Sequence, residues 1–170
     1  MIKKFTKKDV TEMLCESNAI EGVYGPDSLE DAQKAWDYII KCKKLEVKDV
    51  LKVHALLMKN KKLLSKHVGA FRDCPVWIGG REGLQWTHIP DQINEWILNM
   101  NSTPATKNTL AQKSRFSVSL HVDFEKIHPW VDGNGRTGRI FMNWWRWKNG
   151  LPIWIIHEGD EQMLYYQIFK

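Results

Sequence analysis

The residues from His128 to Arg139 carry the side chains best suited to chemistry in this chain. They read HPWVDGNGRTGR and combine an imidazole, a carboxylate, an amide and two guanidinium groups with three glycines. Around Asn134, Gly133 and Gly135 allow backbone angles that turn several N–H groups to one side and line an anion-binding concavity. The segment therefore predicts a phosphate-binding loop.

The flanking residues extend this prediction from phosphate binding to catalysis. The sequence after the loop has helical spacing, so we expect a helix whose N-terminus also favours anions. Arg136 and Arg139 lie on one face of it, and each can fork onto phosphate oxygens. Asp132 is a hard oxygen ligand that suits magnesium when a nucleotide supplies the other oxygens. His128, with an ordinary pKa of about 6.5, suits a general base near neutrality. Together these residue types indicate a nucleotide transferase.

Each part of the loop also has a structural interpretation. A histidine before proline can be structural, an Asp-Gly-Asn-Gly run is an ordinary turn, and paired arginines often form a solvated helix face. The joint occurrence of all these residues at fixed offsets favours the functional interpretation.

The stretch HPWVDGNGRTGR resembles the signature of the Fic domain, usually written HPFx(D/E)GNGRxxR. It matches every specified position except Trp130, where the family usually has phenylalanine. The resemblance implies transfer of AMP from ATP to a serine, threonine or tyrosine hydroxyl of a target protein. Kinase-like relatives called Doc carry lysine in place of Gly135, so the glycine disfavours transfer of the terminal phosphate.

The resemblance also implies a role for each site residue. His128 would deprotonate the target hydroxyl, and Asp132 would hold Mg²⁺. The residues implied for phosphate binding are Gly133, Asn134 and Gly135 at the α- and β-phosphates, with Arg136 and Arg139 at the outer ones. Tyr165 or Tyr166 lies where the family tends to place adenine contacts, although core packing is the commoner role of an aromatic pair at a helix end.

A second resemblance lies near the N-terminus, in the run SNAIEG from Ser17 to Gly22. Autoinhibited Fic proteins carry a helix with the pattern (S/T)xxxE(G/N), which Ser17, Glu21 and Gly22 fit, although the pattern fixes only three positions. The resemblance implies that Glu21 pairs with Arg139 and occupies the site that the γ-phosphate needs. It places the chain in the group regulated by its own N-terminal helix, without a separate antitoxin.

Helices are predicted for most of the chain that positions the loop. Capping patterns at Thr6 with Asp9 and at Ser28 with Asp31 mark two helix starts. The predicted helices cover 6–22, 28–40, 47–59, a stretch including 93–100, 108–127, the residues after the loop, and a last one from about 160; a polar loop covers 101–106. The long helix delivers His128, and within it His121 and Glu125 are interpreted as structural residues that position the loop.

Glycines and prolines break the helical pattern between residues 69 and 88. Val76, Trp77 and Ile78, followed by Leu84 to Thr87, predict two short strands around a glycine-rich turn. The run GAFRDCPVWIGG, residues 69–80, resembles the sequence around the Fic flap, a hairpin that lies over the active site and holds the target by main-chain pairing.

Composition limits the fold and the setting. With 170 residues, 43% of them hydrophobic, and nine tryptophans, the chain can bury one sizeable core. We predict a single all-α Fic-type domain over 1–170 with an inhibitory helix at 1–22, a flap hairpin at 69–88 and a catalytic loop at 128–139. The sequence has neither an apolar run long enough to span a membrane nor a secretion signal. Cys15, Cys42 and Cys74 fit neither a disulfide framework nor a zinc site, which predicts a cytoplasmic protein.

Three functions fit this sequence. The first is a protein adenylyltransferase inhibited by Glu21, and the second is removal of AMP from a modified target. The third is a catalytically silent module that binds nucleotide or protein, against which the intact His128 and Asp132 argue. The net charge of +5 comes from interspersed charges and does not favour nucleic-acid binding. The target and a possible homo-oligomeric state stay open.

Overall fold

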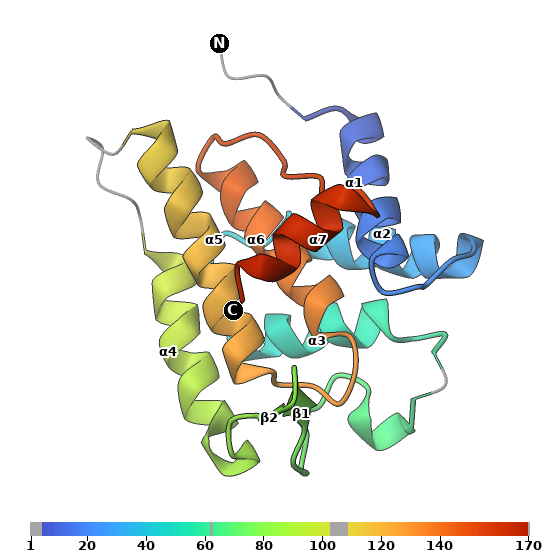
Figure 1. Cartoon of the computed structure of the whole chain (residues 1–170), viewed down its shortest axis with the longest axis vertical. Coiled ribbons are helices and arrows are strands. Elements are labelled where there is room, and N and C mark those ends of the chain that lie inside the picture. The colour runs from blue at the N-terminus through green and yellow to red at the C-terminus, as the bar shows by residue number, and fades with distance from the viewer. Residues whose placement is uncertain (1–4, 62, 103–108, 170) are drawn as a thin grey trace.

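The computed structural model describes residues 5–61, 63–102 and 109–169. Within them the chain forms seven α-helices and one two-stranded antiparallel sheet (Figure 1). The elements are α1 (Lys7–Ala19), α2 (Pro26–Ile39), α3 (Val47–Leu57), η1 (Ser65–His67), β1 (Trp77–Ile78), β2 (Arg81–Glu82), η2 (Trp86–His88), α4 (Ile89–Asn101), α5 (Leu110–Ile127), α6 (Asn134–Lys148) and α7 (Asp160–Gln167). The predicted helical fold with one small hairpin is confirmed.

Helix α6 is the central element of the fold. From Asn134 to Arg146 every residue except Gly135 is buried, and the helix packs against α1, α2, α3 and α5. A helix buried on nearly all sides must find partners for its polar side chains among its neighbours. Arg136 and Arg139 must therefore find their hydrogen-bond acceptors on the surrounding helices.

Aromatic rings fix the end of α5 relative to α4 and α6. The Trp96 ring lies 4.9 Å from the Phe124 ring and 5.3 Å from the Phe141 ring, centroid to centroid. The indole N–H of Trp96 also donates to the Leu120 carbonyl at 2.8 Å. Because α5 leads directly into His128, this packing determines where the imidazole stands.

Helix α1 begins as the sequence predicts. Thr6 Oγ1 accepts from the Asp9 N–H at 3.2 Å, and Asp9 Oδ2 accepts from the Thr6 N–H at 2.8 Å, which is a reciprocal capping box. The helix ends at Ala19, and Gly22, at φ 64°, completes the turn that follows. Glu21 therefore lies in a turn beyond the helix.

The start of α2 differs from the prediction. The helix begins at Pro26, not at Ser28, since proline is favoured in the first turn, where its missing N–H costs nothing. The Ser28 hydroxyl accepts from Lys61 Nζ at 2.6 Å, and the Asp31 carboxylate accepts from Asn60 Nδ2 at 3.0 Å. The polar pair that resembled a cap instead ties α2 to the turn after α3.

The hairpin forms, but its second strand lies earlier than predicted. Trp77 pairs with Glu82 and Ile78 with Arg81. Gly79 and Gly80 have φ values of 55° and 82°, as a two-residue turn of type I′ requires, so the return strand must start at residue 81. The stretch predicted as that strand, 84–87, instead leads through η2 into α4.

Several other sequence predictions concern the chain ends and the loops. Most of the polar loop predicted at 101–106, and the first residues of the helix predicted at 108, lie outside the described residues. All three cysteines are free. In the part of the chain that the structure describes, no helix is long and apolar enough to cross a membrane.

Candidate active site

His128 follows α5 directly and has an unusual backbone conformation. Its φ of 48° and ψ of 61° are left-handed, and no other non-glycine residue in the described ranges has a positive φ. Such a conformation persists only where the surroundings fix it. The His128 N–H donates to the Phe124 carbonyl at 3.0 Å, and the His128 carbonyl accepts from Arg72 Nε at 2.7 Å. Hydrogen bonds at both its N–H and its carbonyl thus fix the backbone that carries the imidazole.

The surroundings of His128 favour a neutral ring. Burial lowers the pKa of the imidazole, the hydrogen bond to the Glu125 carbonyl opposes this, and the charge of Arg72 lowers the pKa further. Nδ1 lies 3.3 Å from that carbonyl oxygen, so a neutral ring places its proton there and leaves Nε2 as an acceptor. This is the form that a general base needs. Burial also raises the pKa of the Glu125 carboxyl, whose Oε2 lies 3.7 Å from Nδ1, to about 7.

The loop after His128 is braced by aromatic stacking and by one amide. Trp130 is fully buried between His54, at 4.1 Å between ring centroids, and Phe71, at 5.3 Å. The Asn134 side chain accepts from the Trp130 N–H at 2.9 Å and donates to the Trp130 carbonyl at 3.0 Å. The Asn134 side chain therefore closes the loop, and the prediction that its backbone N–H helps to cradle phosphates stays a prediction.

His54 on α3 supports the same loop and was not identified from the sequence. Its Nδ1 accepts from the Gly69 N–H at 2.9 Å, so Nε2 carries the proton and donates to the Asp132 carbonyl at 3.0 Å. Burial lowers the pKa of His54 to about 4 and keeps it neutral. A histidine within an apolar helical pattern gives no signal of this role.

The N-terminus of α6 has the uncapped first turn that the predicted phosphate site requires. Gly133, at φ 85°, is the N-cap and offers no side chain to the first-turn N–H groups. These groups and the helix dipole favour a negative charge at this end. Gly133 itself lies against α3, where a Cβ would approach Met58 Sδ to 2.8 Å. The glycine is therefore needed for both its conformation and its close packing.

Arg136 is buried at the same end without adequate partners. It is 2% exposed, and its Nη2 lies 3.3 Å from Met58 Sδ and 3.6 Å from Asp132 Oδ2. Its Nε and Nη1 have no acceptor among the described residues, and burial lowers its pKa. Each unsatisfied buried donor costs about 1–3 kcal/mol, more when charged, which makes Arg136 a candidate for binding an anion.

Arg139, one turn later, is fully engaged by its own chain. Its Nε donates to Ser17 Oγ and its Nη2 to the Ser17 carbonyl, both at 2.9 Å. Nη1 donates to the Tyr165 hydroxyl at 3.0 Å, and Nη2 forms an ion pair with Glu21 Oε1 at 2.7 Å. Burial opposes the charge, but Tyr165 and Glu21 outweigh it and raise the pKa of Arg139. The pairing of Glu21 with Arg139 expected from the sequence is present.

Glu21 also lies against the first turn of α6. A Cβ added at Gly135 would overlap with the Glu21 carboxylate and would approach Arg139 Nη1 to 3.0 Å. The carboxylate, 34% exposed at its side chain, therefore stands at the helix N-terminus, where an anion binds favourably. A glycine at this position gives Glu21 room to enter.

The two tyrosines of α7 have different surroundings. Tyr165 is 3% exposed, and its hydroxyl lies 2.7 Å from His121 Nε2. Tyr165 thus belongs to the core and completes the Arg139 contacts, which corrects its assignment to adenine. Tyr166 is 43% exposed, and its role as an adenine contact stays a prediction. His121 is buried and the Glu125 side chain is 15% exposed, which agrees with their structural interpretation.

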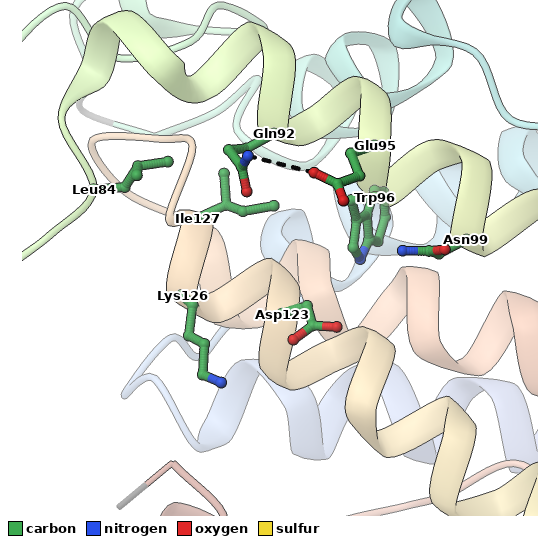
Figure 2. Close-up of a pocket in the computed structure, with 8 residues that line it drawn as sticks. All are labelled: Leu84, Gln92, Glu95, Trp96, Asn99, Asp123, Lys126 and Ile127. Carbon is green, nitrogen blue, oxygen red and sulfur yellow. Dashed lines mark hydrogen bonds between the residues drawn. The ribbon is translucent and has the colours of Figure 1, made fainter.

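The hairpin and a neighbouring cleft lie beside the turn that carries His128. Trp77 is 73% exposed, whereas Val76 and Ile78 are partly buried. A cleft of about 330 Å³ begins at Leu84, just after the hairpin, and follows the groove between α4 and α5 to Ile127 (Figure 2). It is lined by Leu84, Gln92, Glu95, Trp96, Asn99, Asp123, Lys126 and Ile127. None of the predicted phosphate-binding residues lines it.

Comparison with known families decides how this geometry is interpreted. The model of the Fic/DOC family matches residues 44–145, more than half of the chain. This chain belongs to the Fic/DOC family. The matched region contains His128, Asp132, Arg136 and Arg139, whereas the Ser17–Gly22 run lies before it.

Solved Fic structures share the fold at low sequence identity. A Fic-1 fragment from C. elegans superposes with a TM-score of 0.78 at 17% identity and covers 96% of this chain and 55% of that chain. A Fic-domain signaling protein from Bacteroides thetaiotaomicron gives 0.79 at 18% identity, covering 95% of this chain and 70% of that one.

Curated relatives of this Fic/DOC chain are named protein adenylyltransferase Fic. The relative from Aedes aegypti is 27% identical over 125 residues, which is 71% of this chain and 23% of the relative. The relative from Drosophila grimshawi is 29% identical over 133 residues, which is 75% of this chain and 26% of the relative. The chain thus spans about a quarter of the length of these relatives.

Within this Fic/DOC site, Asp132 is the residue that fits a metal. Its side chain is 61% exposed, and its Oδ1 accepts from the Gly133 N–H at 2.6 Å. Over the described residues no group of three or more acidic, histidine or cysteine side chains could hold an ion by itself. Magnesium often takes one or two protein carboxylates and completes its shell with substrate phosphates and waters. The donors fit a magnesium ion that arrives with a nucleotide.

Proposed function

We propose that this chain transfers AMP from ATP to a serine, threonine or tyrosine hydroxyl of a target protein, and that Glu21 restrains this activity in cis. The observation that carries the proposal is the buried, under-partnered guanidinium of Arg136 at the uncapped N-terminus of α6. It follows His128 within the region that the family model matches. The names of the Aedes and Drosophila relatives support adenylyl transfer as the use of a bound nucleotide.

The proposed chemistry is an in-line displacement at phosphorus. His128 Nε2 takes the proton of the target hydroxyl while its oxygen bonds to the α-phosphorus of ATP. The bond from that phosphorus to the oxygen bridging the α- and β-phosphates breaks, pyrophosphate leaves, and His128 releases its proton to solvent. Arg136 and the first N–H groups of α6 stabilise the developing charge, so no covalent enzyme intermediate is needed. Magnesium, when held by Asp132, would neutralise phosphate charge.

The hairpin is suited to hold the target segment. Strand β1 pairs with β2 on one side, and its other edge has no strand partner in the described part of the chain. An extended segment of the target can add to that edge through main-chain hydrogen bonds. The exposed Trp77 ring offers apolar area to the bound segment, and Val76 and Ile78 alternate with it along the strand.

Inhibition by Glu21 follows from competition for Arg139. The carboxylate and a γ-phosphate are both anions that would use the same guanidinium and the same helix terminus. A carboxylate carries less charge, but a tethered group competes at a millimolar-scale effective concentration. ATP bound while Glu21 stays in place would lack its outer contact and adopt an unproductive pose.

The decisive experiment uses Glu21→Gly with magnesium and ATP labelled at the α-phosphate. We expect this variant to label itself or an added target more than the wild type does, and His128→Ala in the same background to abolish labelling. Glu21→Gln isolates the charge, and Glu16→Gln is the matched control. Glu16 is a carboxylate on α1 that accepts from the Glu158 N–H at 3.0 Å instead of contacting Arg139.

Other outcomes would identify the alternative functions. Label that arrives only from the γ-phosphate indicates kinase chemistry, and ATP binding without any transfer indicates a silent module. Release of AMP from a pre-modified target by protein with intact Glu21, but not by Glu21→Gly, would assign removal of AMP. The partly exposed Glu21 carboxylate could then position a water molecule.

A further inference from the structure

Arg72 connects the hairpin to the turn that carries His128, although it takes no part in the proposed chemistry. Its Nε donates to the His128 carbonyl at 2.7 Å, and its Nη1 donates to the Cys74 carbonyl at 2.9 Å. Its Nη2 donates to the Leu84 carbonyl. One guanidinium therefore contacts the residue of the proposed base and both ends of the hairpin segment.

The hairpin depends on these contacts for its orientation. Its two strands contain two residues each, Trp77–Ile78 and Arg81–Glu82, and the Gly83 N–H adds one bond to the Val76 carbonyl at 2.8 Å. An isolated two-stranded hairpin is marginally stable at best. Arg72 donates to the Cys74 carbonyl before the strands and to the Leu84 carbonyl after them. These contacts close the base of the hairpin and fix the direction in which the hairpin projects.

The same residue holds the turn after α5. Three successive carbonyls accept from Arg72: Ile127 from Nη2 at 3.5 Å, His128 from Nε, and Pro129 from the Arg72 backbone N–H at 2.9 Å. The middle residue has the left-handed conformation that needs support from its surroundings. Arg72 therefore supplies the contacts on the carbonyl side of His128, while the Phe124 carbonyl accepts from its N–H.

The charge of Arg72 is not explained by an ion pair. The residue is 2% exposed, its side chain donates only to carbonyl oxygens, and no carboxylate pairs with it among the described residues. Burial accordingly lowers the pKa of Arg72. A buried charge without a counter-charge costs stability. Its planar fork, however, reaches several carbonyls at once, which a lysine ammonium cannot do in the same geometry.

We propose that Arg72 is a positioning residue that fixes the target-docking hairpin relative to His128. The inference rests on the proposed function only in assigning the target segment to the hairpin. An acceptor hydroxyl held on β1 reaches the imidazole within bonding distance only if both stand in one fixed relation. Small displacements of reacting groups cost large factors in rate, so this connection controls turnover.

The test compares Arg72→Met and Arg72→Lys with Arg146→Met. Arg146 is another buried arginine, 6% exposed, whose Nε donates to the Pro152 carbonyl at 2.8 Å away from His128. Two readouts need no catalysis: hydrogen exchange of the hairpin amides, and an NMR titration of His128, assigned with His128→Ala. The third readout is transfer of AMP to a target by the variants in the Glu21→Gly background, with the affinity for ATP measured separately.

We expect at least tenfold faster amide exchange in the hairpin of both Arg72 variants. The pKa of His128 should rise in Arg72→Met and stay nearer its wild-type value in Arg72→Lys, because the lysine keeps a positive charge. The other titratable groups near His128 are the Glu125 carboxyl, whose Oε2 lies 3.7 Å from Nδ1, and Glu21 after α1, and both are the same in these variants. Target modification should fall at least tenfold while the dissociation constant for ATP changes less than twofold.

Arg146→Met should lose stability without changing the hairpin or His128. If hairpin exchange and the His128 titration of a folded Arg72 variant match those of Arg146→Met, Arg72 is only a packing residue and the proposal is overturned. If Arg72→Met does not fold, Arg72→Lys decides the outcome through hairpin exchange. Absence of AMP transfer in every protein, including Glu21→Gly alone, would count against the proposed function and leave the first two readouts valid.

Discussion

Arg136 and Arg139 lie three residues apart on one helix and are equally buried, yet their surroundings are opposite. Each is 2% exposed. Arg136 points to α3, with a thioether and a distant carboxylate for one nitrogen and nothing for the other two. Arg139 points to α1 and α7, and each of its three nitrogens donates to a partner from its own chain.

The different neighbours of Arg136 and Arg139 follow from the geometry of the helix. At 3.6 residues per turn, a spacing of three separates side chains by about 60°, which on a fully buried helix is enough to reach different neighbours. Among the residues that the structure describes, Arg136 has no carboxylate within hydrogen-bonding distance, whereas Arg139 is paired with Glu21. Under the proposed function, Arg136 would bind the nucleotide directly, and Arg139 would bind it only after Glu21 withdraws.

The largest expected effect is on nucleotide binding by Arg136→Met. Loss of two charge-assisted hydrogen bonds, each contributing about 1.5–3 kcal/mol, should weaken binding of a non-hydrolysable ATP analogue at least 100-fold. The measurement is calorimetry in the Glu21→Gln background, with Arg146→Met as the control that keeps wild-type affinity. Unchanged affinity in Arg136→Met would remove the distinction between the two arginines.

For the free energy of unfolding, we expect the larger effect from the substitution of Arg139 and the smaller one from that of Arg136. Arg139→Met leaves Tyr165 and Glu21 without their cation and should lower the free energy of unfolding by about 3 kcal/mol, the low end for a broken buried pair because Glu21 is partly exposed. Arg136→Met removes an under-partnered charge and should change it by less than about 1 kcal/mol. Urea denaturation of both variants checks this, and equal losses would contradict the comparison.

Glu21→Gln tests how strongly the inhibitory carboxylate competes. Removal of one charge from the Arg139 contact should raise the affinity for the ATP analogue by about tenfold, or about 1.4 kcal/mol. The effect should shrink in Arg139→Met, where no guanidinium remains to be freed. A gain of the same size in Glu16→Gln would show that general surface charge, rather than the contact with Arg139, is responsible.

The last expected effect is a pH dependence of stability, which arises from the buried His121 and develops only as the pH falls. Burial, and then the charge of Arg139, lower the pKa of His121 to about 3, whereas an unfolded histidine titrates near 6.5. The unfolded chain therefore binds a proton that the folded chain excludes, and stability falls as pH drops below about 6.5, by at most about 1.4 kcal/mol per unit.

His121→Gln should remove this contribution. The raised pKa of Glu125 has the opposite effect between 4.5 and about 7 but is common to both proteins. The difference between wild type and variant therefore isolates His121. Urea denaturation at pH 7, 6 and 5 measures it, and parallel curves would mean that His121 is not excluded from protonation.

The sequence predicts those parts of the fold that depend on local patterns. The Thr6 capping box, the helical spacing and the glycine-rich loop each depend on residues close in sequence, and each is present. The start of α2 was misplaced because Ser28 and Asp31 form the local pattern of a cap but serve tertiary contacts. Periodicity also could not locate β2, because the turn at Gly79 and Gly80 sets the residue at which that strand begins.

In the candidate site, too, the sequence predicts the residues of the local motif but not those that only the fold brings to it. The motif singles out His128, Asp132 and the two arginines as candidates because their types and offsets suit the proposed chemistry. It does not identify Arg72 or His54, whose partners are carbonyl groups 56 and 78 residues away in sequence and therefore follow only from the fold. Nor could spacing reveal that the two arginines turn to different neighbours.

The place of Glu21 beyond the last turn of α1 affects how quickly inhibition could be relieved. Three backbone bonds close the turn that contains Glu21: the Asn18 carbonyl accepts from the Glu21 N–H and the Val23 N–H, both at 3.0 Å, and the Ala19 carbonyl accepts from the Gly22 N–H at 2.8 Å. Under the proposed function, Glu21 can leave Arg139 by rotation within this turn while α1 stays packed. Loop motions of this kind take nanoseconds to microseconds, so exchange of carboxylate for phosphate would be fast compared with turnover.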